Sequence, residues 1–148
     1  MRLSRRLRLG VTGAALAVSG VGAAVIPAGP AVAFFSPPLF LDVRVDSPLH
    51  LVAGGAAVNV QVEATCTGPS ADVVVIVTQA VGNGVASGTG SQTIGCTHGR
   101  EFISITVRAD PGGKAFKTGN AFAEGAIFGC DGPTCGVEHD QENVKIRK

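Results

Sequence analysis

One alternating segment constrains the fold of this chain more than any other feature. In VNVQVEATC (58–66), apolar and polar side chains occupy strictly alternating positions. Successive side chains of a β-strand point to opposite faces of a sheet, so this period of two predicts a strand with one buried face. LDVRV (41–45), FISITV (102–107) and NVKIRK (143–148) alternate in the same way. These strands need a second apolar layer to cover them.

Other segments are apolar without this alternation. DVVVIVT (72–78) is largely β-branched and predicts a central strand covered on both faces. AFAEGAIFGC (121–130) is irregular, and Gly125 suggests a bulge. The glycine-rich stretch 82–95 carries little bulk, so we expect a floppy edge or a long loop there.

Turn signals separate these segments at regular intervals. GPS (68–70), GNG (82–84) and DPGG (110–113) are turn sequences, and no segment shows a sustained helical period. The pattern predicts an all-β fold, an antiparallel immunoglobulin-like β-sandwich of about seven strands, over residues 41–148 as a single domain. A small Greek-key barrel is the alternative.

The N-terminus predicts export. Four arginines within MRLSRRLRLG precede an uncharged, largely apolar run that closes on Ala31-Val32-Ala33, a small-residue cleavage pattern. We therefore expect a signal peptide over residues 1–33, followed by a flexible lead-in, FFSPPLF (34–40). An uncleaved membrane anchor is the alternative, but Pro27 and Pro30 make a poor spanning helix. Arg8 stands where a twin-arginine signal would have an apolar residue, which favours the general secretory route.

Removal of residues 1–33 changes the charge balance. The remaining chain has eight basic and eleven acidic residues, a formal net charge of −3. Binding to nucleic acid depends on Lys and Arg that displace phosphate counterions, so we expect no nucleic-acid partner. We expect a secreted or envelope-associated protein with an unknown extracellular or cell-surface partner and no stable membrane insertion after cleavage.

The four cysteines follow the predicted signal. An even number of cysteines in an oxidising compartment predicts disulfides, and we expect the pairs Cys66–Cys96 and Cys130–Cys135. Cys66 and Cys96 share the inward parity of their segments, and the turn DGPT (131–134) brings Cys130 and Cys135 together.

GCDGPTCGVEHD (129–140) also has a metal-binding interpretation. Cys130, Cys135, His139 and Asp140 could ligate zinc, but a second ligand pair at a familiar spacing is missing. A redox centre would require Cys-x-x-Cys. We therefore expect a disulfide, with no metal and no cofactor, and His139 as an exposed loop residue.

Candidate catalytic groups are scattered along the sequence. His50, His98 and His139 lie in polar, turn-like surroundings, and no serine stands in G-x-S-x-G. Paired carboxylates for glycoside hydrolysis have no obvious candidates. We therefore expect no enzyme activity, and a hydrolase is the third choice among functions.

Phenylalanine is the sole aromatic residue of the chain, which has no Trp or Tyr. Phe116, Phe122 and Phe128 recur at even spacing, and Phe102 alternates outward from Ile103. The first three predict core positions or, alternatively, a ligand-facing stripe. Phe102 is the best candidate for an exposed aromatic residue. All four are candidate ligand-binding residues.

The exported, Gly/Ala/Val-rich, two-disulfide composition resembles uncharacterised small secreted immunoglobulin-like proteins of high-GC Gram-positive bacteria. Cys130-x4-Cys135, Gly136-Val137 and the closing strand resemble the C-terminal end of the neocarzinostatin-type chromoprotein apoproteins. Those proteins are immunoglobulin-like sandwiches that cradle an apolar chromophore. Their other disulfide closes a short hairpin, whereas Cys66 and Cys96 are thirty positions apart, so no ligand residues carry over.

These observations predict a non-catalytic secreted domain that acts as an interaction or structural module. The alternative is an extracellular carrier of an apolar small molecule, which the resemblance to chromoproteins implies.

Overall fold

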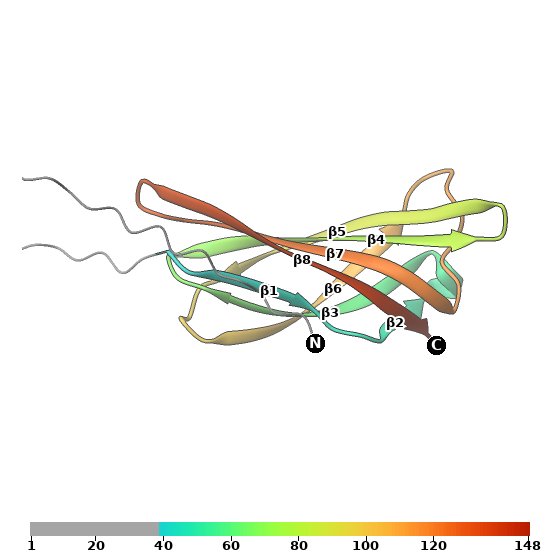
Figure 1. Cartoon of the computed structure of the whole chain (residues 1–148), viewed down its shortest axis with the longest axis horizontal. Coiled ribbons are helices and arrows are strands. Elements are labelled where there is room, and N and C mark those ends of the chain that lie inside the picture. Colours follow the sequence, from blue (N-terminus) through green and yellow to red (C-terminus); the bar gives the residue numbers. More distant parts are fainter. Residues whose placement is uncertain (1–38) are drawn as a thin grey trace, which may run out of the picture. The chain divides into compact units, whose positions relative to one another are not determined.

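The computed structural model describes residues 39–148; the predicted signal peptide and most of the predicted lead-in lie outside the described residues. Eight strands and one short 3-10 turn follow each other along the described chain (Figure 1). They are β1 (Leu41–Val45), β2 (Leu49–Val52), η1 (Ala53–Gly55), β3 (Ala57–Cys66), β4 (Ser70–Val81), β5 (Gly84–Gly95), β6 (Arg100–Ala109), β7 (Gly119–Asp131) and β8 (Thr134–Arg147). The prediction of an all-β fold is confirmed.

The strands form one sheet that closes on itself. Hydrogen-bonded neighbours follow the order β3-β2-β8-β7-β4-β5-β6, and β6 pairs back with β3. β1 pairs with the C-terminal half of β3, and β2 with its beginning. The pairings are antiparallel except that of β2 with β8. Seven strands therefore make a closed barrel with β1 attached, and the prediction of a sandwich with two separate sheets is wrong on this point.

The barrel closes through two short junctions. β5 meets β6 at two residue pairs, Gly88↔Ala109 and Thr89↔Arg108, and β2 meets β8 at two others. A methyl group on Gly88 would overlap the carbonyl oxygen of Arg108, and one on Gly90 would lie 2.7 Å from the carbonyl oxygen of Thr106. The glycines therefore let the backbone of β5 approach β6 closely. The expectation of a long loop over residues 82–95 is wrong, because residues 84–95 form strand β5. The expectation of an edge agrees with its pairing, since β5 meets β6 at Gly88 and Thr89 alone among the described residues.

Alternation places the core as the sequence predicts. Val58, Val60 and Val62 of β3 are fully buried, and Ile105 and Val107 of β6 and Val144 and Ile146 of β8 also face inward. Burial of such side chains provides the main favourable free energy of folding. β4 departs from the prediction: it is central, but its burial alternates, and Ile76 is 42% exposed. Its outer face meets solvent, so the expectation that it is covered on both faces is wrong.

The segment β7–β8 is more regular than its sequence indicates. Gly125 stays in continuous register with Val75 of β4 and Asp140 of β8, so the predicted bulge is wrong. A methyl group on Gly125 would instead lie 2.8 Å from Cγ2 of Val45 on β1. β8 begins at Thr134, nine residues before the predicted closing strand at 143. β2 was not expected, since four residues are too few for alternation to show.

Candidate functional site

The stretch GCDGPTCGVEHD forms the end of the β7–β8 hairpin. Cys130 and Cys135 are directly paired residues of β7 and β8 and form a disulfide with an S–S distance of 2.07 Å. Both cysteines are exposed. The prediction of this pair is confirmed, and the two sulfurs are covalently joined rather than available as thiolate ligands. Within residues 39–148, no group of three or more metal-ligating side chains is assembled.

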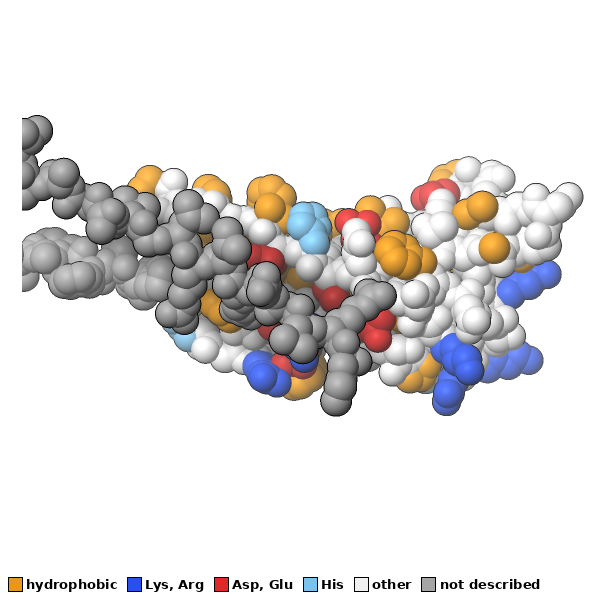
Figure 2. All heavy atoms as spheres, viewed as in Figure 1, with side chains coloured by type: hydrophobic (Ala, Val, Ile, Leu, Met, Phe, Trp, Pro, Cys, Tyr) orange, Lys and Arg blue, Asp and Glu red, His pale blue; other side chains and the backbone are white. Residues whose placement is uncertain are grey.

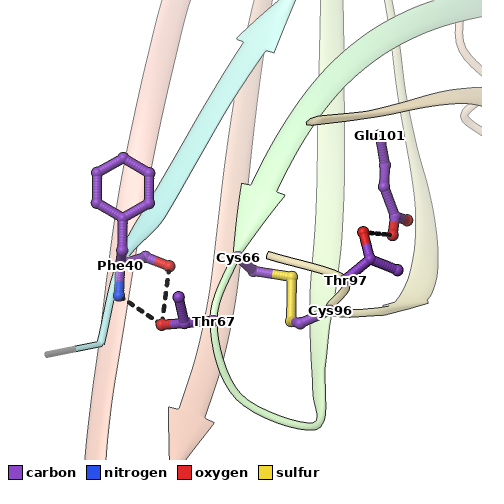
Figure 3. The surroundings of a disulfide bond; sticks show 6 residues. All are labelled: Phe40, Cys66, Thr67, Cys96, Thr97 and Glu101. Carbon is purple, nitrogen blue, oxygen red and sulfur yellow. Dashed lines mark hydrogen bonds between the residues drawn. A yellow bond between two sulfur atoms is a disulfide. The ribbon is translucent and has the colours of Figure 1, made fainter. Parts of the chain in front are cut away.

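The second disulfide joins the end of β3 to the residue after β5 (Figure 3). Cys66 and Cys96 have an S–S distance of 2.09 Å, which confirms the other predicted pair. Cys66 is 2% exposed, and Cys96 packs against the core. Nearby, the Thr67 Oγ1 accepts a hydrogen bond of 2.8 Å from the Phe40 nitrogen. The Cys66–Cys96 disulfide thus connects β3 to the end of β5, where the last part of β5 has no pairing with β6.

His139 and Asp140 lie on β8 rather than in a loop, so the loop assignment of His139 is wrong. They point to opposite sides of the strand. His139 Nδ1 lies 3.8 Å from Glu124 Oε1 on the outer side, whereas the Asp140 Oδ2 accepts a hydrogen bond of 2.8 Å from the Val45 nitrogen of β1. The two residues are therefore separated and serve different contacts.

The three histidines lie on separate elements. His50 is on β2, His98 follows β5 with a φ of 62°, and His139 is on β8. The structure brings none of the three next to another in the paired register of the sheet.

The four candidate ligand-binding phenylalanines do not form one stripe. Phe116 is 1% exposed and belongs to the core, which agrees with the core interpretation of this residue. Phe122 and Phe128 are 40% and 58% exposed on the outer side of β7. Phe102 is 69% exposed on β6, where it pairs with Glu63 of β3. Binding of an apolar ligand by these residues stays a prediction.

Phe122 and Phe128 belong to a larger exposed surface on β4, β7 and β8. Cross-strand register places Phe128 beside Val137, Ala126 beside Val74, and Ile76 diagonally beside both Phe122 and Ala126. We call this surface the apolar face; its members are Val74, Ile76, Phe122, Ala126, Phe128 and Val137. Four of them are at least 40% exposed. Contiguous apolar patches of a few hundred Å² on a soluble protein commonly mark interaction sites.

Polar groups surround and interrupt the apolar face. Glu124 lies between Phe122 and Ala126 on β7, where it contacts His139, and Asp72 at the other side accepts a hydrogen bond from Thr93 Oγ1 at 2.6 Å. In Figure 2, hydrophobic side chains recur along one side of the molecule next to a histidine and acidic groups. An apolar centre with polar groups at its edge is the usual composition of a protein–protein interface.

Two shallow pockets lie elsewhere, and polar residues outnumber apolar ones in the lining of each. The first, of about 420 Å³, is lined by Ser47, Pro48, Asn120, Asn143, Val144, Lys145 and Arg147. The second, of about 440 Å³, lies between β1 and β8 and is lined by Arg44, Val45, Asp46, Asp140, Gln141 and Glu142. None of the described phenylalanines lines either of these two pockets.

No known family model and no curated protein matches this sequence. The structure is loosely similar to the crystal structure of AggA, the major subunit of aggregative adherence fimbriae type I from Escherichia coli. That chain is 10% identical, the match covers 75% of this chain and 95% of AggA, and the TM-score is 0.40. Within residues 39–148, no helix is long and apolar enough to cross a membrane.

Sequence reasoning missed the apolar face as a unit. The sequence singles out Phe122 and Phe128, but it places Ile76 in a strand covered on both faces, and Val137 lies outside the predicted strands. The missing signal was the pairing of β7 with both β4 and β8, which brings side chains from three strands into contact.

Proposed function

We propose that residues 39–148 form a non-catalytic interaction module that works outside the cytoplasm and binds an apolar surface of another protein through the apolar face. The exposure of Phe122, Phe128, Ile76 and Val137 on adjacent strands carries this proposal. Leaving these side chains in water forgoes about 25 cal/mol of stabilisation per Å² of apolar surface. Covering them in a complex would recover part of that free energy.

The two disulfides support a location outside the cytoplasm. Disulfides persist in oxidising compartments and are rare in the cytosol, where thiols are kept reduced. All four cysteines of the chain are paired in these bonds. Together with the predicted signal peptide, they favour secretion or association with the cell envelope.

The separation of titratable groups supports a role without catalysis. General acid–base and nucleophilic mechanisms need side chains within hydrogen-bonding reach of one another. His50, His98 and His139 lie on separate elements, and the sole ion-pair partner of His139 among the described residues is Glu124 on the open outer surface. A binding role without a cofactor accounts for this surface most simply.

The strand connectivity supports a relation to immunoglobulin-like domains. The seven-strand immunoglobulin arrangement has the order A-B-E-D in one sheet and C-F-G in the other. If β1 and β2 together are strand A, the pairings β1-β3-β6-β5 and β4-β7-β8 follow those two orders. We propose that this barrel is an immunoglobulin-like arrangement in which β5 pairs with strands of both sheets.

Substitution of the apolar face tests the function. The immobilised full chain should capture a partner from the cell-surface or secreted fraction of the host. The Phe122→Ser/Phe128→Ser variant, immobilised in the same way, should no longer capture it. Phe102→Ser is the matched control, because Phe102 is even more exposed but lies on β6, away from the apolar face. Thermal melting checks that each variant stays folded.

Three results decide the matter. Loss of the same captured protein with Phe122→Ser/Phe128→Ser, and its retention with Phe102→Ser, supports the proposal. Equal capture by all three proteins would overturn the role of the apolar face. An apolar compound that is extracted from the purified protein and raises its Tm when added back would favour the small-molecule carrier instead.

A further inference from the structure

Strand β8 has one edge that is paired over little of its length. β7 pairs with β8 along the whole strand, from Gly119↔Ile146 to Asp131↔Thr134. On the other edge, among the described strands, β2 pairs with Ile146 and Arg147 alone. Within residues 39–148, residues 135–143 therefore have no strand partner on that side.

The register tells which backbone groups this edge offers. In an antiparallel pair, alternate residues direct both N–H and C=O toward the partner. The two-residue turn at Gly132 and Pro133 makes Asp131 and Thr134 such a pair, so even-numbered residues of β8 bond to β7. The backbone N–H and C=O groups of odd-numbered residues point away from β7, as the hydrogen bond from the Lys145 nitrogen to Ser47 Oγ (3.2 Å) shows. Val137, His139 and Gln141 thus present N–H and C=O groups to the open edge.

Strand β1 forms the opposite wall of a groove along this edge. β1 pairs with β3. The hydrogen bond from the Asp46 nitrogen to the Gln61 oxygen (2.9 Å) shows that the even-numbered residues of β1 direct their backbone N–H and C=O groups toward β3. The backbone N–H and C=O groups of its odd-numbered residues point away from β3, toward the side of β8. There the Val45 N–H donates to the Asp140 carboxylate rather than to a backbone oxygen of β8. This groove is the second pocket described above, of about 440 Å³. Two strand edges therefore border it without pairing to each other, which is the geometry that accepts an added extended segment.

Charge selects the kind of segment that fits. Glu138, Asp140 and Glu142 occupy successive even positions of β8, and within the described residues none of the three lies within 4 Å of a basic side chain. Of the residues that the structure describes, Arg44 is the one basic residue that lines the groove. A second copy of β8 in antiparallel register about Asp140 would place Glu138 opposite Glu142 and Asp140 opposite itself. Like charges directly opposite each other destabilise a sheet, so these carboxylates disfavour self-pairing.

We propose that the open edge of β8 binds an extended segment of another protein with Lys or Arg at alternate positions. Backbone hydrogen bonds to Val137, His139 and Gln141 hold the segment as an added strand. Its basic side chains lie against Glu138 and Glu142. This binding surface shares Val137 with the apolar face but uses the backbone of that residue rather than its side chain, and the proposal does not depend on the function proposed above.

A synthetic peptide tests the proposal directly. The probe is an eight-residue peptide of alternating lysine and threonine with blocked ends, and the control peptide has glutamate in place of lysine. The full chain should bind the lysine peptide at least tenfold more tightly than the glutamate peptide. Increasing salt should weaken that binding, because exposed ion pairs are screened.

Gln141→Pro isolates the backbone contribution. This substitution removes an N–H that β7 does not use, and proline is tolerated at strand edges for that reason. We expect at least a tenfold weaker Kd for the lysine peptide, whereas Gln141→Ala should stay within about twofold of the unsubstituted chain. Glu138→Gln/Glu142→Gln should also weaken binding tenfold at low salt and reduce its salt dependence.

Amide exchange on the unsubstituted chain keeps the proposal testable even if Gln141→Pro fails to fold. The lysine peptide should slow exchange at Val137, His139 and Gln141. Equal binding of both peptides, full binding by folded Gln141→Pro, or unchanged exchange at these amides would each overturn the proposal. Phe122→Ser/Phe128→Ser should bind the peptide normally, so failure at the apolar face is distinguishable from failure at this edge.

Discussion

Gly125 of β7 lies directly against Val45 of β1, and a methyl group added to Gly125 would stand 2.8 Å from the Val45 Cγ2. Val43 Cγ2 would lie at 3.5 Å. A valine side chain on a strand has little freedom to move aside. Gly125→Ala should therefore destabilise the protein by about 1–3 kcal/mol, the usual cost of overpacking, as measured by urea denaturation. Gly95→Ala is the control, because no atom of the described residues lies within 4 Å of its added methyl group. It should be neutral or stabilise by about 0.4–1 kcal/mol.

The seam between β5 and β6 makes a second glycine prediction. A methyl group on Gly88 meets a backbone atom, the Arg108 oxygen, which cannot yield as a flexible side chain can. Gly88→Ala should cost about 3 kcal/mol or more and speed amide exchange across the seam. Gly84→Ala meets the mobile end of Lys114 instead and should have little effect. If both variants exchange like the unsubstituted protein, close approach at Gly88 does not close the barrel.

The two disulfides should differ in reducibility and in stabilisation. Cys130 and Cys135 are exposed, whereas Cys66 is buried. Under native conditions, a mild reductant followed by alkylation should label Cys130 and Cys135 first, as read by peptide mass mapping. In the chain-entropy model, losing the Cys66–Cys96 bond should cost about 4 kcal/mol and losing the hairpin bond about 2 kcal/mol. Simultaneous labelling of all four cysteines would contradict the burial difference.

Gln79 is a buried polar residue, 4% exposed, that anchors the segment before β7. Its Oε1 accepts a hydrogen bond from the Lys117 nitrogen at 2.8 Å, and its Nε2 donates to the Lys117 oxygen at 2.8 Å. Gln79→Leu leaves these backbone groups without a partner, which should cost about 1–3 kcal/mol in urea denaturation. Gln92→Leu on the exposed part of β5 is the matched control and should change stability by less than about 0.5 kcal/mol. An equal loss in both variants would show that the amide contacts contribute nothing specific.

Alternation in the sequence predicted the features that depend on the local order of apolar and polar side chains, namely the positions of strands and their buried faces. β1, β3, β6 and the end of β8 lie where the period of two placed them, and both cysteine pairs formed as expected. Closure of the barrel could not be predicted in this way, because it depends on the close approach of Gly88 on β5 to Arg108 on β6, and alternation within one strand does not show which strands meet. The same holds for Gly125, because the need for a glycine there comes from its contact with Val45 of β1, which is distant in sequence.

The candidate surfaces were harder to predict than the core. An exposed Val137 or Ile76 looks like any core residue in the sequence, and its exposure follows from which face of β4 or β8 the barrel leaves open. The groove between β1 and β8 depends on a pairing that does not form. Such a feature has no local sequence pattern, because the residues on each side are ordinary strand residues.

The Cys66–Cys96 bond makes the two short junctions of the barrel unequal. It ties β3 to the end of β5 on the side of the β5–β6 junction, whereas among the described residues no covalent bond bridges the β2–β8 junction. Thermal fluctuations should therefore open the barrel unevenly. We expect β2 and β8 to separate first, while the disulfide on the opposite side keeps β3 and the end of β5 together as a hinge.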